Sequence, residues 1–324
     1  MIRAYIHGGY EKFLSLRAYV QSLGTPTEQE WLDARQGGIG GSDAPVVLEQ
    51  SPWKSPLELW GEKTGRLAAP KLESDAVEMG KLLEPVVIQR FQQKSGLETW
   101  GWPGTISILH PDLPWLFATP DAVIFDPTRG VGLGQIKTTD RWGAKHWADG
   151  PPLYHQIQVQ HELAACQADW GMLILLIDGR QLRWFVQERN DAFIAQMLDV
   201  EGEFWHCCLN EVPPEIGSSG AVKVKDLGKT LAKLYGHEDG SQIILPDESI
   251  VWDSELQSMK SAIKKLTEEK DLLESRIKAA IGEATVGMTP GGIGYSWTTT
   301  ERAAYEVKAT SYRVLRRIAA PKKK

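Results

Sequence analysis

Between residues 105 and 139, three short stretches rich in β-branched and aromatic residues follow one another, and helical patterns flank them on both sides. The first helical pattern, over residues 75–95, repeats apolar side chains every three or four positions, and the second covers residues 153–168. A strand, a tight turn and another strand are then predicted over residues 171–189. A chain ordered in this way folds as an α/β protein, and we expect a central mixed sheet flanked by helices.

The composition is that of an ordinary globular protein, with 42% hydrophobic and 24% charged residues over 324 positions. This apolar content builds a sizeable core without disulfides, and the length predicts two domains, or one large domain with appendages. No stretch of about 18 uncharged apolar residues occurs, so we expect no membrane span. The cysteines (Cys166, Cys207 and Cys208) form no CxxC pair, which indicates a reducing, cytoplasmic location.

The C-terminal part of the chain has a different pattern from the rest. We expect residues 1–210 to form the core and residues 211–250, which are richer in Pro, Gly and Ser, to form a linker. Residues 251–324 are expected to hold a coiled-coil-like helix, a short β segment and a basic tail. The helix could pair with another helix of the same chain, which we favour, or with another chain. The tail could bind phosphates or serve only solubility.

Residues 25–35 predict a short helix that leads into the glycine-rich turn QGGIGG. Thr27 is placed to cap its start, and Glu30, three residues later, completes a capping box. Arg35 lies in the last turn of this helix, directly before the glycines.

Four polar side chains stand at the edges of apolar runs: Glu84 in a helical pattern, and Asp121, Gln135 and Lys137 in β-type runs. Residues two apart in a strand point to the same side, so Gln135 and Lys137 share one face of the sheet, and Asp121 on a neighbouring strand can face that side too. Phosphodiester hydrolysis requires oxygen ligands and a lysine placed together in this way. Hard oxygen ligands hold Mg²⁺, which activates water, and a nearby lysine stabilises charge developing at phosphorus. Each residue taken alone is more often a solvated surface group.

The sequence resembles a known family in five blocks that occur in the same order. They are RQGGIGGSDAPVVLEQSPWKSPLELWGEKTG, MGKLLEPVVIQRF, TPDAVIF, GLGQIKTT and YHQIQVQHELAA. Together they are similar to the YqaJ-like viral recombinases, the phage lambda-type alkaline exonucleases within the PD-(D/E)xK nucleases. The resemblance covers about residues 30–200 and implies a restriction-endonuclease-like core.

The resemblance also implies roles for particular residues. Asp121 matches the metal-binding aspartate, Lys137 the catalytic lysine, and Glu84 the helix carboxylate that supports the metal site. The backbone carbonyl of Ile136 would be a further metal ligand. Gln158 matches the helix glutamine that lies near the scissile phosphate.

The glycine-rich turn is a candidate phosphate site. Gly40 and Gly41 allow backbone N–H groups to approach an anion closely, and Arg35 supplies positive charge. A plain flexible turn is the alternative reading of the same glycines. By resemblance, Arg35 and Ser42 match the pocket that holds a terminal 5′-phosphate.

One position departs from the family pattern, which usually has Glu where this chain has Gln135. An amide still offers an oxygen, but it binds Mg²⁺ less strongly than a carboxylate and leaves one less negative charge in the site. Three explanations stay open: a natural variant that still cleaves, a natural loss of activity, or a deliberate substitution that traps substrate. We prefer the first and the third.

The function that the resemblance implies is a Mg²⁺-dependent 5′→3′ exonuclease, with Mn²⁺ able to substitute. It would act on double-stranded DNA with 5′-phosphate ends and leave 3′ overhangs for a single-strand annealing protein, in a bacterial host, encoded by host, phage or prophage. A homo-oligomeric ring, such as a trimer, is expected. The alternatives are a structure-specific or endonucleolytic deoxyribonuclease on the same scaffold, and a DNA-binding homologue that is inactive because of Gln135.

Overall fold

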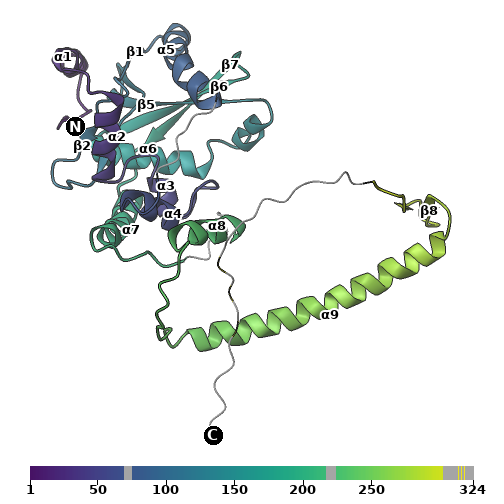
Figure 1. The fold of residues 1–324 in the computed structure, drawn as a ribbon. Helices are drawn as coiled ribbons and strands as arrows, with labels where there is room; N and C mark the ends of the chain where they lie inside the picture. Colours follow the sequence, from purple (N-terminus) through teal and green to yellow (C-terminus); the bar gives the residue numbers. More distant parts are fainter. Residues whose placement is uncertain (69–74, 217–223, 302–312, 314, 316, 318–324) are drawn as a thin grey trace. The chain divides into compact units, whose positions relative to one another are not determined.

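The computed structural model describes residues 1–68, 75–216, 224–301, 313, 315 and 317 (Figure 1). The chain divides into two compact units, Met1–Gly236 and His237–Lys324. No helix in the described ranges is long and apolar enough to cross a membrane.

The first unit contains a short 3₁₀ helix, η1 (Gly143–Trp147), and most of the regular structure of the protein. Its α-helices are α1 (Tyr10–Ser22), α2 (Glu28–Gln36), α3 (Ala44–Val47), α4 (Pro56–Lys63), α5 (Asp75–Ser95), α6 (Leu153–Cys166), α7 (Asp191–Leu209) and α8 (Val224–Leu234). Its strands are β1 (Glu98–Gly101), β2 (Ile108–Leu109), β3 (Phe117–Ala118), β4 (Ala122–Asp126), β5 (Gly130–Thr139), β6 (Trp170–Ile177) and β7 (Gln181–Glu188).

The central sheet has five strands in the order β1-β4-β5-β6-β7. The β5–β6 pair is parallel and the other pairs are antiparallel, so the sheet is mixed. The parallel pair is joined through α6, because two parallel neighbours need a crossover connection. The strands β2 and β3 form a separate short antiparallel pair. The α/β fold with a mixed central sheet flanked by helices, predicted from the sequence, is confirmed.

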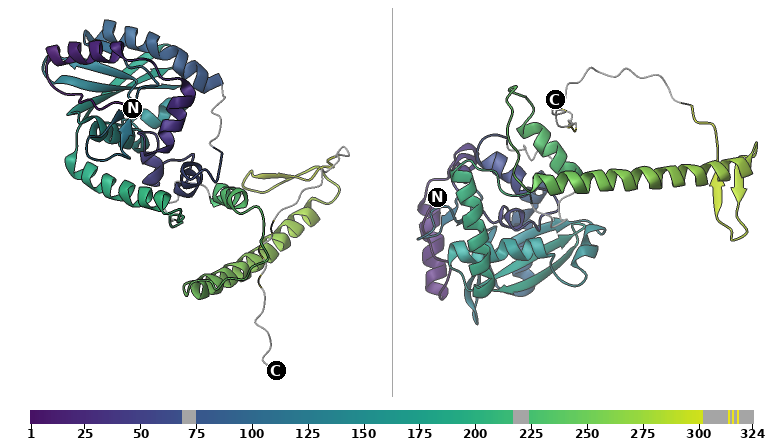
Figure 2. Two further views of the ribbon diagram at one scale, coloured as in Figure 1. Left: turned by 60° about the vertical axis from the view of Figure 1, so that its left-hand side comes forward. Right: turned by 90° about the horizontal axis from the view of Figure 1, so that it is seen from below.

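Helices cover both faces of the sheet (Figure 2). On one face, Val87 and Phe91 of α5 pack against alternate residues of β4, β5 and β6, among them Ile136. On the other face, α1 and α6 pack against the intervening residues, among them Leu133, and α7 packs on α6. Because side chains alternate along a strand, the residues of β5 divide between an α5 side and an α6 side.

Helix α2 begins as the sequence predicts. The Thr27 hydroxyl accepts a hydrogen bond from the Glu30 N–H, and the Glu30 carboxylate accepts one from the Thr27 N–H at 2.8 Å. This capping box satisfies two N–H groups that a helix start otherwise leaves unpaired. Arg35 lies in the last turn of the helix, so the helix delivers its side chain to the glycine-rich turn.

Within residues 211–250, for which the sequence predicts a linker, the structure has the helix α8, and the boundary between the two units falls after Gly236. Leu227 and Leu231 of α8 pack on the apolar cluster around Trp60. Apolar residues four positions apart form one face of a helix, and burial of that face on α4 attaches α8 to the first unit. The Pro, Gly and Ser residues on either side of α8 dominate the composition of residues 211–250, so the sequence did not predict this short helix.

The second unit consists of the long helix α9 (Ser249–Ile281) and the hairpin of β8 (Val286–Met288) and β9 (Gly294–Ser296). The predicted coiled-coil-like helix is thus present. Its heptad positions are exposed, as Ile263 and Leu266 show. The described part of this unit has no second helix, so the favoured pairing within the same chain does not occur inside the unit.

Candidate active site

Strand β5 carries two of the predicted site residues on one face. Gln135 and Lys137 follow Leu133 at intervals of two, and Leu133 belongs to the core that lies under α6. Ile136 points to the opposite face, into the core under α5. The expectation that Gln135 and Lys137 share a face is therefore confirmed, and α6 is the helix that covers it.

Asp121 is fixed to β5 by two hydrogen bonds. Its Oδ2 accepts from the Ile136 N–H at 2.6 Å, and its own N–H donates to the Gly134 carbonyl at 3.1 Å. Burial raises the pKa of the Asp121 carboxyl, although the Lys137 ammonium and the Ile136 N–H act in the opposite direction. Asp121 thus lies at the start of β4, beside the strand that bears Gln135 and Lys137.

Glu84 reaches the same place from α5. A Cβ on Gly80, one turn earlier in this helix, would lie 3.7 Å from the Thr138 hydroxyl, so α5 crosses the end of β5 closely. Burial, followed by repulsion from Asp121, raises the pKa of Glu84 to about 7, with Lys137 and Lys81 opposing the shift. Two carboxyls and one lysine from separate elements therefore form one electrostatically coupled group.

The donor groups of this cluster fit a divalent cation of the hard type. Carboxylate and amide oxygens are the ligands that Mg²⁺ takes, and the buried Oε1 of Gln135 has no hydrogen-bond partner. Buried polar atoms normally have a partner, so this orphaned oxygen fits a position that a ligand completes. The residues that the structure describes contain no group of three or more His, Cys, Asp or Glu side chains placed to hold a metal ion. The amide of Gln135 does not belong to these residue types.

Helix α6 adds Gln158 and a second residue that sequence reasoning missed, Glu162. The Gln158 Nε2 donates to the Glu162 Oε1 at 2.9 Å. Glu162 is only 2% exposed, and its other oxygen, Oε2, has no hydrogen-bond partner. The signal that could have found it is its spacing, because a residue four positions after Gln158 lies on the same helix face.

Glu162 is coupled to the residues of β4 and β5. Burial, followed by repulsion from Asp121, raises the pKa of Glu162 to about 8. The Gln158 amide and the Lys137 ammonium favour the charged form and oppose that shift. The α6 carboxyl therefore belongs to the same electrostatic group as Asp121 and Lys137.

The glycine-rich turn packs closely on its neighbours. A Cβ on Gly41 would lie 2.6 Å from the Glu162 Oε1, and a Cβ on Gly38 would lie 2.2 Å from the Trp115 carbonyl oxygen. The turn is also bonded to the chain around β3, since the Ile39 N–H donates to the Trp115 carbonyl at 2.7 Å. Glycine is required here for close approach, and the alternative of a plain flexible turn does not fit these contacts.

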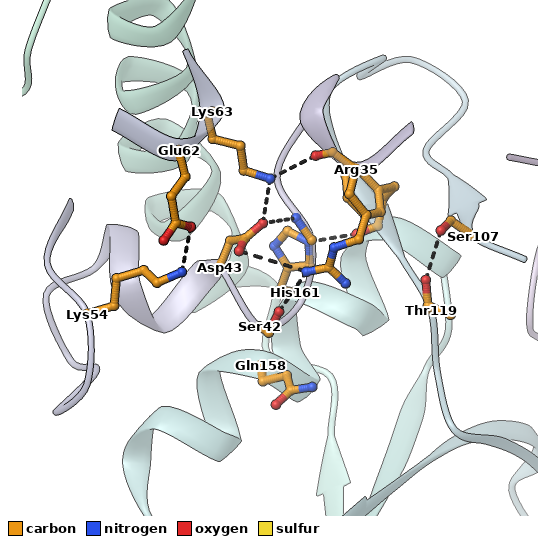
Figure 3. Close-up of polar contacts among 12 residues, drawn as sticks. Arg35, Ser42, Asp43, Lys54, Glu62, Lys63, Ser107, Thr119, Gln158 and His161 are labelled. Atoms are coloured by element: carbon orange, nitrogen blue, oxygen red, sulfur yellow. Dashed lines mark hydrogen bonds and ion pairs between the residues drawn. The ribbon is translucent and has the colours of Figure 1, made fainter. Parts of the chain in front are cut away.

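Charged residues form a compact network beside this turn (Figure 3). The Arg35 Nη2 donates to the Ser42 Oγ at 3.0 Å, and Lys63 Nζ lies 2.9 Å from the Asp43 Oδ2. Lys63 also donates to the Arg35 carbonyl at 2.8 Å, and the Gly40 N–H donates to Asp43 at 3.1 Å. We call Arg35, Ser42, Asp43 and Lys63 the cationic pocket. With two cations and one carboxylate, it keeps an excess positive charge.

The electrostatics of the cationic pocket favour the charged forms. Burial alone would raise the pKa of Asp43, but Lys63 and Arg35 outweigh burial and hold that pKa well below its usual range. The Arg35 guanidinium lies 4.8 Å from the centre of the Trp31 ring, which fixes its orientation further. An oriented guanidinium beside a hydroxyl is suited to bind a phosphate, whereas the Gly40 N–H, expected to approach an anion, donates to Asp43 instead.

A buried pair anchors α6 next to these residues. His161 Nδ1 lies 2.8 Å from the Glu201 Oε1 of α7, and His161 Nε2 lies 3.0 Å from the Phe117 carbonyl of β3. The side chains of His161 and Glu201 are fully buried. The Glu201 carboxylate raises the pKa of His161 against the effect of burial. This contact ties α6, α7 and β3 together and so positions Gln158 and Glu162.

The fold and the site together define a class of protein: an α/β protein whose mixed sheet brings carboxyls and a lysine together beneath a glycine-rich turn. The sequence model of the YqaJ-like viral recombinase domain matches residues 30–169. A protein of Bacillus subtilis (strain 168), named uncharacterized protein YqaJ, is 30% identical over 269 residues, which are 81% of this chain and 80% of that protein. The chain belongs to the YqaJ-like viral recombinase family, as its sequence predicts.

Solved structures are similar to part of the chain. One is an alkaline exonuclease (LHK-Exo) from Laribacter hongkongensis, with a TM-score of 0.49 and 23% identity, over 64% of this chain and 99% of that one. Another is a phage-related exonuclease from Haemophilus somnus 129PT, with a TM-score of 0.41 and 11% identity, over 54% and 96% of the two chains.

The structure thus brings the predicted residues into two adjoining groups. Glu84, Asp121 and Lys137 are coupled to one another, and Gln158 joins them through Glu162. Arg35 and Ser42 are bonded to each other in the cationic pocket. The roles assigned to these residues, and the role of the Ile136 carbonyl, stay predictions.

Proposed function

We propose that this chain is a Mg²⁺-dependent 5′→3′ exonuclease that acts on the ends of double-stranded DNA. The observation that carries the proposal is the contact between Gly41 and Glu162. It places the cationic pocket directly beside the carboxyl and lysine group. A site that holds a terminal phosphate next to a hydrolytic group cuts at the end of a strand, because the bound phosphate sets the position of the next bond.

The proposed roles of the site residues follow from the chemistry of their side chains. Asp121, Glu84, the Gln135 Oε1 and the Ile136 carbonyl would hold Mg²⁺, for which Mn²⁺ is expected to substitute. When bound, Mg²⁺ supplies charge neutralisation and activation of water. The Lys137 ammonium stabilises negative charge that develops on the scissile phosphate. Gln158 can orient water or a phosphate oxygen from α6.

The cationic pocket would bind the 5′-phosphate of the strand that is degraded. Arg35 donates from its guanidinium, and Ser42 and the backbone of Gly41 complete the anion site. Lys63 is already paired with Asp43, so its contribution is to hold the carboxylate and the Arg35 carbonyl in place. The product of such resection is a 3′ overhang, which a single-strand annealing protein would take up.

We further propose that the protein works in the cytoplasm of a bacterial host as a homo-oligomeric ring such as a trimer. A ring around the duplex keeps the enzyme on its substrate between cuts. Such a ring needs a basic channel and not a basic protein, which is compatible with the net charge of -6.

The test compares a linear duplex that has 5′-phosphate ends with a covalently closed circle of the same sequence. We expect metal-dependent release of nucleotides from the linear duplex, no nicking of the circle, and loss of cleavage when EDTA removes the cation. Nicking of the circle would instead favour an endonuclease. Absence of cleavage on both, with Mg²⁺ or Mn²⁺ present, would contradict a nuclease function.

A further inference from the structure

On β5, the site described above has an amide, Gln135, at the position where the family usually has a carboxylate. Gln135 is neutral, and its buried Oε1 has no partner. The affinity of an oxygen-ligand site for a divalent cation depends on the number of charged ligands, so replacement of a carboxylate by an amide weakens such a site. A functional site with this amide needs negative charge from another element.

Glu162 can supply this negative charge. It is the only acidic residue of α6 (Leu153–Cys166), whose other residues are neutral side chains and histidines. The carboxyl lies beside the turn at Gly41, and its Oε1 accepts from Gln158 at 2.9 Å. It projects from the helix that covers the face of β5 on which Gln135 and Lys137 lie. Its charge is coupled both to Asp121 and to Lys137.

The free oxygen of Glu162 is the second, independent observation. Oε2 is buried and has no hydrogen-bond partner. A buried carboxylate is costly unless it is paired with a cation or with donors. The positive charge of Lys137 already acts on the carboxyls of Asp121 and Glu84. Gln135 on β5 and Glu162 on α6, the helix that covers this face of β5, thus each have a buried oxygen without a hydrogen-bond partner. A cation bound by both side chains would satisfy both oxygens.

We propose that Glu162 supplies the carboxylate that Gln135 lacks, and that with Asp121 it holds the divalent cation. The inference rests on the proposed nuclease function for its biological meaning, but its content is a metal-binding role for one named side chain. In this arrangement, the negative charge has moved from strand β5 to helix α6, and the amide at position 135 no longer implies an inactive protein.

The experiment measures Mn²⁺ binding to the full-length chain by calorimetry, without DNA, and cleavage of the linear duplex in parallel. Glu162→Gln keeps the size of the side chain and its bond with Gln158, and it removes the cost of a buried charge, so the variant should fold. We expect the Mn²⁺ affinity to fall about tenfold or more, because one charged ligand is lost. Cleavage should fall with it.

Two further variants complete the design. The exchange Gln135→Glu with Glu162→Gln returns the carboxylate to β5 and should recover most of the Mn²⁺ affinity and of the cleavage. Glu62→Gln is the matched control, since Glu62 is also a buried glutamate with a raised pKa, and its ion pair is with Lys54 and not with a residue of the proposed cation site. It should bind Mn²⁺ as the parent does.

Unchanged Mn²⁺ affinity in Glu162→Gln would overturn the inference, and so would an exchange variant no better than Glu162→Gln alone. These failures are distinct from failure of the proposed function. A parent chain that binds Mn²⁺ through Glu162 and cleaves no DNA contradicts only the nuclease proposal. A parent that cleaves DNA, with Mn²⁺ affinity independent of Glu162, contradicts only the inference.

Discussion

In the cationic pocket, the carboxylate of Asp43 lies between two cations. Around the end of β5, the carboxyls of Asp121, Glu84 and Glu162 are all coupled to Lys137, and Lys81 acts on Glu84 as well. The pKa of Asp43 is lowered, and the pKa values of the other three are raised. Asp43 and Glu162 are both buried, yet their pKa values shift in opposite directions, so the balance of nearby charges makes the difference.

The two groups of one site thus favour two ligands of opposite charge. The cationic pocket is electrostatically complete and has a surplus of positive charge, which suits an anion such as a terminal phosphate. The group around β5 has more carboxyls than ammonium groups and two buried oxygens without partners, which suits a cation. Stability and function are therefore expected to separate between the two groups.

The largest expected effect is on catalysis, at Lys137. Lys137→Ala removes the ammonium that is coupled to all three carboxyls, and we expect cleavage of the linear duplex to fall by about 10³-fold, as for loss of a transition-state donor. Thermal unfolding and DNA binding should change little. Cleavage within tenfold of the parent would show that the carboxyl group works without this lysine.

The next effect concerns stability, and it lies in the cationic pocket. Asp43→Asn leaves the buried Lys63 ammonium without a counter-charge, so we expect the free energy of unfolding to fall by about 3–5 kcal/mol. Urea unfolding followed by tryptophan fluorescence measures this change. Asp33→Asn, on the exposed side of α2, is the control, for which about 0.5 kcal/mol or less is expected. Equal effects of the two variants would contradict the role of Asp43 as a buried counter-ion.

A smaller effect is expected on the choice of DNA end. Arg35→Ala removes the guanidinium that donates to Ser42, and the preference for 5′-phosphate over 5′-hydroxyl ends should fall by about tenfold, the equivalent of one charge-assisted hydrogen bond. The measurement is the initial cleavage rate on each type of end. Arg90→Ala, on the exposed face of α5, should keep the preference. Equal losses on both ends would assign Arg35 to general DNA binding instead.

The smallest expected effect is the pH dependence of stability without metal. Glu84 and Glu162 have pKa values of about 7 and about 8 in the folded protein, above the ordinary value of 4.5. The folded state therefore binds more protons than the unfolded state between these values, so their contribution is complete below pH 4.5 and is lost as the pH rises toward 8. Asp43 acts in the opposite direction, since its contribution is present above its ordinary pKa and is lost only in strong acid.

Unfolding by urea at pH 5, 6.5 and 8 checks this prediction. The parent should lose stability across the series, and Glu162→Gln should lose less, because one of the two titrating groups is gone. Saturating Mn²⁺ should reduce the slope, since the cation favours the charged carboxylates. A Glu162→Gln variant with the slope of the parent would show that Glu162 does not titrate in this range.

Much of the scaffold could be predicted from local patterns. The capping box at Thr27 and Glu30 depends on residues three positions apart, and the shared face of Gln135 and Lys137 depends on strand periodicity alone. The order of helices and strands likewise predicted the mixed sheet. Helix α8 was missed because its apolar face has meaning only against α4, and the surrounding Pro, Gly and Ser residues indicated a linker.

The residues of the candidate site could be predicted from the sequence, but their contacts with one another could not. Asp121, Gln135, Lys137 and the glycine-rich turn were all identifiable, because their residue types have chemistry that the sequence displays. Which of them share an electrostatic environment depends on contacts between residues far apart in the chain. The bond between Asp121 and the Ile136 N–H is one such contact.

By itself, the sequence determined the α/β order, the faces of β5 and the residue types available for phosphate and metal chemistry, because these follow from spacing along the backbone. Only the tertiary structure decided that Lys63 neutralises Asp43, that Gly41 packs on Glu162, and that the carboxyl of α6 joins the group around Asp121. The physical reason is that charge coupling and burial depend on distance in space, which the packing of α5 and α6 on the sheet sets.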